Sequence, residues 1–212
     1  MSTLVSGVFQ FPKNYLLSPM NSNDLPDGLA RRSSLLGDDT GDDMVTFTPI
    51  RELLRLQPNI HRSGVIVYSY DETTKKTYFY MGIDSKSGDI TDFGGGVRSH
   101  ENFVNAGLRE LHEESGGIFN KNINSRNVSN FYVASSKRMS IMFIRIDVDY
   151  SLLKQSFIAT KELADIIRLD PAEFVQMVFS DNNNYNNYKV YHIVKSFLKN
   201  FLQHNTNFMK LI

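Results

Sequence analysis

The pattern of hydrophobic and polar residues predicts strands and helices from about residue 61 onwards. SGVIVYSY and KTYFYMGI are rich in β-branched and aromatic residues and flank a polar turn, as in a β-hairpin. DITDF, NFYVASS and MSIMFIRIDV predict three further strands. Because a helical segment lies between these strands and a last helix follows them, the order predicts a mixed α/β domain.

Two longer helices are predicted from apolar residues at helical spacing. Val104, Leu108 and Leu111 form an i, i+4, i+7 stripe that can pack on a sheet, so we expect a helix over about 101–115. Gly116 suits the left-handed position just past the end of this helix. YKVYHIVKSFLKNFLQ carries a second apolar stripe and predicts a C-terminal helix over about 187–203.

The first 45 residues have no lasting hydrophobic period. They are rich in Ser, Asn, Asp, Gly and Pro, so we expect residues 1–45 to form a poorly structured or extended arm. The whole chain has 212 residues, of which 41% are hydrophobic, and this suits one globular domain with an extension. The predicted domain covers 46–212.

Composition narrows the chemistry. Cysteine is absent, which excludes disulfides, thiol catalysis and cysteine-based zinc sites. Lys+Arg and Asp+Glu balance at 23 each, so no global basic field favours tight non-specific nucleic-acid binding. Apolar runs stay below the roughly 18 residues of a membrane span, and the N-terminus is a poor signal peptide. We therefore expect a cytoplasmic protein with no membrane partner.

Three glutamates share one face of the helix predicted over 101–115. Glu110, Glu113 and Glu114 are spaced i, i+3, i+4, and such like charges oppose folding unless a positive group lies among them. Converging carboxylates suit a hard divalent cation such as Mg²⁺ or Mn²⁺, which can bridge phosphate oxygens and activate water. A solvated helix face is the alternative for any three glutamates at this spacing. Upstream glycines can let backbone approach a substrate and offer N–H groups to an anion: Gly94, Gly95 and Gly96.

The spacing around these glutamates resembles the Nudix box, G-x5-E-x7-R-E-U-x-E-E-x-G-U, where U is aliphatic. Eight of the nine defined positions match with the same gaps, from Gly95 to Gly116. The departure is Gly117, which stands where an aliphatic residue is usual, and we expect Ile118 to fill that core position. The resemblance implies a Nudix α/β/α sandwich with a mixed β-sheet between the box helix and the C-terminal helix.

The resemblance also implies roles for the box residues. Glu110, Glu113 and Glu114 correspond to metal ligands, and Glu110 is a ligand, a base or both. Arg109 corresponds to the arginine that orients a box glutamate in the active site, with Glu101 as its partner. Many relatives carry a further glutamate beyond the box as base or ligand. Glu162 is the best candidate here, Asp165 is second, and a surface glutamate is the alternative.

The implied activity is Mg²⁺- or Mn²⁺-dependent hydrolysis of a pyrophosphate bond. A nucleotide or another diphosphate-containing small molecule is the expected partner: nucleotide-sugar, dinucleoside polyphosphate, diphosphoinositol, nucleoside triphosphate and mRNA-cap substrates remain open. A non-catalytic nucleotide-binding module is less favoured, because such modules usually lose box glutamates. A homodimer also remains open. Richness in Asn, Lys, Ile, Phe and Tyr suggests an AT-rich genome, such as that of a large DNA virus.

Overall fold

The computed structural model describes residues 44–56, 58–123, 131–180, 188–205 and 207–212. Residues 1–43 of the predicted arm lie outside the described residues, so the arm stays a prediction. Within the described part, Val45 is already buried in the core, and the first strand begins at Thr46. The core therefore starts at the residue before the predicted boundary.

The described residues form one eight-stranded sheet with helices between and after its strands. The strands are β1 (Thr46–Pro49), β2 (Arg62–Asp71), β3 (Lys76–Asp84), β4 (Ile90–Thr91), β5 (Phe93–Gly96), β6 (Tyr132–Ser135), β7 (Met139–Arg145) and β8 (Leu163–Leu169). The helices are α1 (Ile50–Leu56), α2 (Phe103–Ser115), α4 (Tyr150–Ser156), α5 (Pro171–Phe179), α6 (His192–His204) and α7 (Phe208–Leu211).

The sheet is mixed, and β2 lies at its centre. The main strand order is β1-β6-β7-β2-β3-β4, with β2 and β7 parallel and the other neighbours antiparallel. On its other edge β2 changes partner: its first residues pair with β5, and its last residues pair with β3. β8 adds to β3 in antiparallel fashion. This split leaves the glycine strand β5 against the start of β2, where α2 crosses the sheet.

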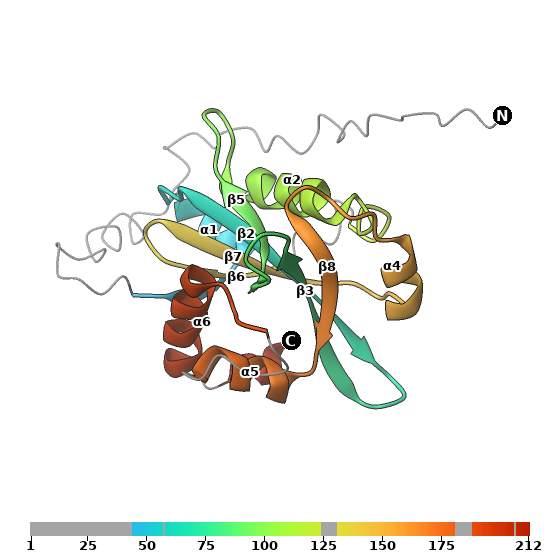
Figure 1. Cartoon of the computed structure of the whole chain (residues 1–212). Helices are drawn as coiled ribbons and strands as arrows, with labels where there is room; N and C mark the ends of the chain where they lie inside the picture. Colours follow the sequence, from blue (N-terminus) through green and yellow to red (C-terminus); the bar gives the residue numbers. More distant parts are fainter. Residues whose placement is uncertain (1–43, 57, 124–130, 181–187, 206) are drawn as a thin grey trace. The chain divides into compact units, whose positions relative to one another are not determined.

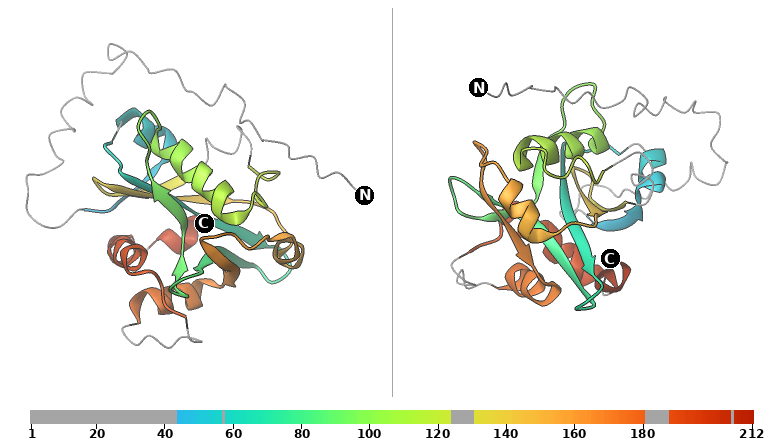
Figure 2. Two further views of the ribbon diagram at one scale, coloured as in Figure 1. Left: turned by 45° about the horizontal axis from the view of Figure 1, so that its top comes forward. Right: turned by 90° about the vertical axis from the view of Figure 1, so that its right-hand side faces the viewer.

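Helices cover both faces of the sheet, which confirms the predicted α/β/α sandwich with a mixed sheet. Figure 1 shows α2 on one face and α5 and α6 on the other, and the right-hand view of Figure 2 shows the same layers from the side. Each face has its own hydrophobic core. Among the described residues, no helix is both long and apolar enough to cross a membrane.

The two predicted helices exist, with shifted starts. The box helix runs over Phe103–Ser115 because Asn102 caps it, its side chain accepting a hydrogen bond from the Asn105 N–H at 2.9 Å. The C-terminal helix begins at His192, later than predicted. The preceding residues are extended because Val190 forms a parallel bridge with Ile90, and the Tyr191 N–H donates to the Ile90 carbonyl at 2.7 Å.

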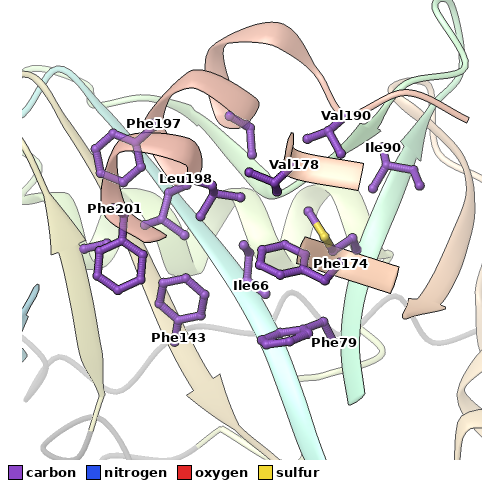
Figure 3. Close-up of a cluster of buried hydrophobic side chains, with 14 of the residues drawn as sticks. Ile66, Phe79, Ile90, Phe143, Phe174, Val178, Val190, Phe197, Leu198 and Phe201 are labelled. Atoms are coloured by element: carbon purple, nitrogen blue, oxygen red, sulfur yellow. The ribbon is translucent and has the colours of Figure 1, made fainter. Parts of the chain in front are cut away.

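The core under α5 and α6 is built largely from aromatic rings. Figure 3 shows Phe79, Phe143, Phe174 and Phe201 gathered between the sheet and these helices. Phe201 is 1% exposed, and its ring centroid lies 4.7 Å from that of Phe208 and 6.2 Å from that of Phe143. Such rings interlock, so removing one leaves a cavity that its neighbours cannot fill.

We expect Phe201→Ala to lower the free energy of unfolding by about 3–5 kcal/mol, the usual cost of deleting a buried phenylalanine ring. Urea unfolding followed by circular dichroism measures this loss. Phe179→Ala is the control, because Phe179 is 37% exposed and should cost only about 1 kcal/mol. Equal losses in the two variants would contradict this account of the core.

Candidate functional site

Helix α2 packs closely on the sheet through its apolar stripe. Val104, Leu108 and Leu111 are buried against β2 and its neighbours, as predicted. Gly107 lets the helix approach, because a Cβ at this position would overlap the end of Met142 and lie 3.0 Å from the Ser63 hydroxyl. The helix ends at Gly116, whose φ of 65° is left-handed. The charged side of α2 is thereby held over β5 and the start of β8.

Three carboxylates from two distant segments come together beside α2. Glu110 and Glu114 on the helix and Glu162, just before β8, each offer an oxygen, and these oxygens all lie within 4.8 Å of one another. Two oxygens bound at about 2.3–2.6 Å on opposite sides of a Ca²⁺-sized ion are about 5 Å apart, and those around Mg²⁺ lie closer. The three side chains therefore fit a shared hard divalent cation after small rotations.

Glu113 lies outside this group of three. Its carboxylate accepts a hydrogen bond from Arg109 at 3.1 Å and lies 3.6 Å from the Arg98 guanidinium, and its side chain is 46% exposed. The structure thus directs Glu113 toward two arginines. Its role as a metal ligand stays a prediction.

Arg109 joins the box glutamates to the glycine strand. It donates to both oxygens of Glu101, at 3.0 and 3.1 Å, and to Glu110 at 2.5 Å. It also donates to the Gly96 carbonyl at 3.0 Å. The Glu101 hydrogen bonds, more than any other contact, raise the pKa of Arg109 above its usual value. Burial alone would raise the pKa of Glu101, but the hydrogen bonds and charges of Arg109 and Arg98 together outweigh it and lower that pKa.

Glu114 is the buried member of the carboxylate group. Its side chain accepts a hydrogen bond from the Gly94 N–H at 2.9 Å. Burial, followed by the nearby charge of Asp92, raises the pKa of Glu114 to about 9. Without a cation the carboxyl therefore holds a proton at neutral pH. A divalent ion would compete with that proton for the same oxygens.

A buried ion pair beside Glu114 was not foreseen from the sequence. Asp92 is fully buried and accepts hydrogen bonds from Arg62 at 2.9 and 2.6 Å. The same guanidinium donates to the Gly94 carbonyl at 3.3 Å. The one sequence signal for this ion pair was an aspartate inside a predicted apolar strand. Its partner could not be identified, because the pairing of β2 with β5 is set by tertiary structure and not by local sequence.

The glycines of β5 make room for acidic side chains. A Cβ on Gly95 would lie 2.5 Å from the Glu110 Oε1, and one on Gly94 would lie 2.7 Å from the Asp92 Oδ2. The Gly94 N–H is already bonded to Glu114, so it is not free for a substrate anion. A Cβ on Gly96 would meet nothing within 4 Å among the described residues. Substrate contacts from these three glycines stay a prediction.

Backbone contacts hold the segment that carries Glu162. The Ser85 N–H donates to the Glu162 carbonyl at 2.8 Å, and the Ser85 hydroxyl donates to the Lys161 carbonyl at 2.8 Å. Thr160 accepts from the N–H of Leu163 at 2.9 Å. Asp165, the second candidate, instead pairs with Lys154 at 3.1 Å. Of the two, Glu162 is the one the fold brings to the carboxylates.

The end of the box departs from the motif for a conformational reason. Gly117 has a φ of 76°, which an aliphatic residue rarely adopts. Ile118 is half-buried against the core, as expected, but Phe119 is fully buried and contacts the Phe93 ring at 5.5 Å between centroids. Phe119, rather than Ile118, is therefore the fully buried residue just after the box.

No family model and no curated protein matches the chain. Among solved structures, it is similar to a C. elegans Ap4A hydrolase complex, at 14% identity over 69% of this chain and 99% of that one, with a TM-score of 0.42. A mutT/nudix family protein from Listeria innocua is similar at 14% identity over 73% and 99%, with a TM-score of 0.42. A bifunctional NMN adenylyltransferase/ADP ribose pyrophosphatase from Francisella tularensis shares 14% over 73% and 44%, with a TM-score of 0.38. These sequence identities and TM-scores are too low to assign a family or an activity, so both are argued from the chain's own residues.

In EDTA, we expect the free energy of unfolding to fall as pH rises from about 5 to 9. Glu114 has a raised pKa of about 9 when folded against 4.5 normally, so in this window the folded state binds a proton that the unfolded state has released. One such group contributes a slope of at most about 1.4 kcal/mol per pH unit. Urea unfolding at several pH values measures the slope, and Glu114→Gln should flatten it. Stability that rises with pH through this window, or an unchanged slope in Glu114→Gln, would contradict the assignment.

Gly95→Ala should weaken Mn²⁺ binding by about tenfold, because the new methyl group occupies the space of the Glu110 carboxylate. Gly96→Ala is the matched control: it adds the same methyl group to the next residue, where space is open, and should change the affinity by less than about twofold. Isothermal titration of each variant with Mn²⁺ gives the comparison. Similar affinities in both variants would mean that Glu110 does not hold the ion.

Proposed function

We propose that the protein is a Mg²⁺- or Mn²⁺-dependent hydrolase of the Nudix type, which cleaves a pyrophosphate bond in a nucleoside diphosphate-linked substrate. The observation that carries this proposal is the meeting of Glu110, Glu114 and Glu162. Two of them belong to a motif that matches the Nudix box at eight of nine positions, and the third comes from a separate segment. A solvated helix face does not account for this arrangement, because Glu114 is buried.

The donor set suits the metal. Glu110 and Glu114 would hold it, since hard cations prefer carboxylate oxygens, and Glu162 places a third carboxylate oxygen within 4.8 Å of theirs. When bound, such an ion neutralises phosphate oxygens and makes a coordinated water more acidic. The chain's own groups place its ligands: Arg109 fixes Glu110, and the Gly94 N–H fixes Glu114.

Glu162 is the better candidate for the general base. Its carboxylate is exposed and, among the described residues, makes no hydrogen bond or ion pair, so it is available to take a proton from water. Glu110, by contrast, uses one oxygen to accept the short hydrogen bond from Arg109. The contacts with Ser85 hold the backbone of the segment that carries Glu162.

The substrate is proposed only by class. A dinucleoside or diphosphoinositol polyphosphate contains the same bond and fits the same chemistry, and so does an mRNA cap. A non-catalytic binding module is disfavoured, because every box glutamate is present. We propose 46–212, with Val45, as the hydrolase domain. A cytoplasmic location and a homodimer stay predictions.

The test is a panel of diphosphate substrates with Mg²⁺ and Mn²⁺, scored for phosphate-containing products. We expect Glu162→Gln to lower kcat by about a hundred- to ten-thousand-fold with little change in KM, as for loss of a general base.

Glu114→Gln should lower turnover by at least about a hundredfold and weaken Mn²⁺ binding. Thermal unfolding confirms that each variant remains folded.

Two outcomes would change the proposal. A Glu162→Gln enzyme within about threefold of the unaltered protein would give the role of base to Glu110 or to the metal-bound water alone. Nucleotide binding without hydrolysis across the panel would support the binding module instead. Glu113→Gln completes the series, because a large loss of Mn²⁺ affinity would show that Glu113 leaves its arginines to bind the ion.

A further inference from the structure

A recess lies on the α2 face of the sheet, apart from the carboxylates. It is open to solvent, with a volume of about 500 Å³, at the end of the β2–β3 hairpin, where β8 and the start of α4 lie side by side (Figure 1). Its lining includes Tyr78, Tyr150 and Arg168. Arg168 follows Leu163 by five residues along β8, which corresponds to roughly 17 Å. The recess is therefore distinct from the group that includes Glu162.

Arg168 presents unused hydrogen-bond donors to this recess. Its guanidinium carbon lies 4.4 Å from the ring centroid of Tyr78 and 4.8 Å from that of Tyr150. Among the described residues, the guanidinium makes no hydrogen bond or ion pair. Contacts over aromatic rings use the flat face of the guanidinium, whereas its N–H groups lie in the plane. The two tyrosine rings therefore contact Arg168 while, among the described residues, its N–H donors make no hydrogen bond.

Three aspartates line the same recess, yet none pairs with Arg168. Asp71 accepts hydrogen bonds from the N–H groups of Thr73 and Thr74, at 2.8 and 3.1 Å. Asp149 caps α4 and accepts from the Ser151 N–H at 2.7 Å. Asp147 lies 4.0 Å from Arg145. Each carboxylate has a local partner, so the guanidinium remains available to a ligand.

The charges decide which kind of ligand fits. Three carboxylates and one guanidinium give the lining a negative balance, which disfavours phosphate or carboxylate groups. A neutral planar ring with two adjacent acceptors satisfies the guanidinium without adding negative charge. Guanine does this through O6 and N7, and its amino and ring N–H donors suit an acidic rim. A volume of about 500 Å³ is in the range of small-ligand sites.

We propose that this recess is a binding site for a guanine base, with Arg168 donating to O6 and N7 and the tyrosines providing the apolar walls. The site goes beyond the proposed hydrolase function and does not depend on it.

The test titrates the full chain with guanosine, adenosine and inorganic phosphate in EDTA, and isothermal titration calorimetry measures binding. We expect guanosine to bind, adenosine to bind about 5- to 150-fold more weakly, and phosphate not to compete, because one bidentate arginine–guanine contact discriminates by this factor. Arg168→Lys and Arg168→Gln should weaken guanosine binding by a similar factor without a change in Tm, since the side chain is exposed. Arg145→Lys is the matched control and should leave guanosine binding unchanged. Arg145 is an exposed arginine near Tyr70 that already pairs with Asp147.

Equal affinities for guanosine and adenosine, competition by phosphate, or unchanged guanosine binding in Arg168→Gln would each overturn the proposal. If Arg168→Gln does not fold, Arg168→Lys and the selectivity of the unaltered chain decide instead. Glu114→Gln should bind guanosine as the unaltered chain does, so failure of the hydrolase proposal and failure of this one remain distinguishable.

Discussion

The arrangement of the candidate site depends on how the buried carboxylate of Glu114 is compensated. A carboxylate removed from water is costly unless hydrogen bonds or positive charges compensate it. Here the Gly94 N–H provides one hydrogen bond, while the second buried acid, Asp92, is neutralised by Arg62. The remaining deficit appears as the raised pKa of Glu114. A divalent cation would remove that deficit, which is why burial of this side chain favours a metal site over an ordinary helix face.

Two arginines hold the two ends of the glycine strand in the positions that the acids require. Arg62 binds the Gly94 carbonyl together with Asp92, and Arg109 binds the Gly96 carbonyl together with Glu101 and Glu110. Between them, the absence of a side chain on Gly95 leaves room for Glu110. The glycines of β5 and the acids of α2 therefore form one structural unit. The strand and the helix approach closely because the glycines leave room for the carboxylates and the arginines pair with them.

Charged side chains also have local partners at the end of β8 that lies far from Glu162. Arg168 is held by tyrosine rings, and the nearby aspartates are used by turns and a helix cap. One face of the sheet thus carries an acidic cluster at one end and an available guanidinium at the other. The acidic cluster suits a cation, whereas the guanidinium of Arg168 suits a hydrogen-bond acceptor. A molecule that carries both kinds of group suits the two sites together.

The sequence by itself determined the class of the fold, the box helix with its apolar stripe and cap, and the shared face of the box glutamates. These features depend on residues a few positions apart, whose geometry follows from helical and strand periods. Only the tertiary structure decided that Glu162 joins Glu110 and Glu114, that Glu113 turns toward Arg98, and that Asp92 pairs with Arg62. The Arg109–Glu113 pair is local (i, i+4), but the Arg98 contact of Glu113 depends on which loop lies above the helix, and the Glu162 and Asp92 contacts join segments whose pairing is set by packing across the sheet. Local periodicity carries no information on either.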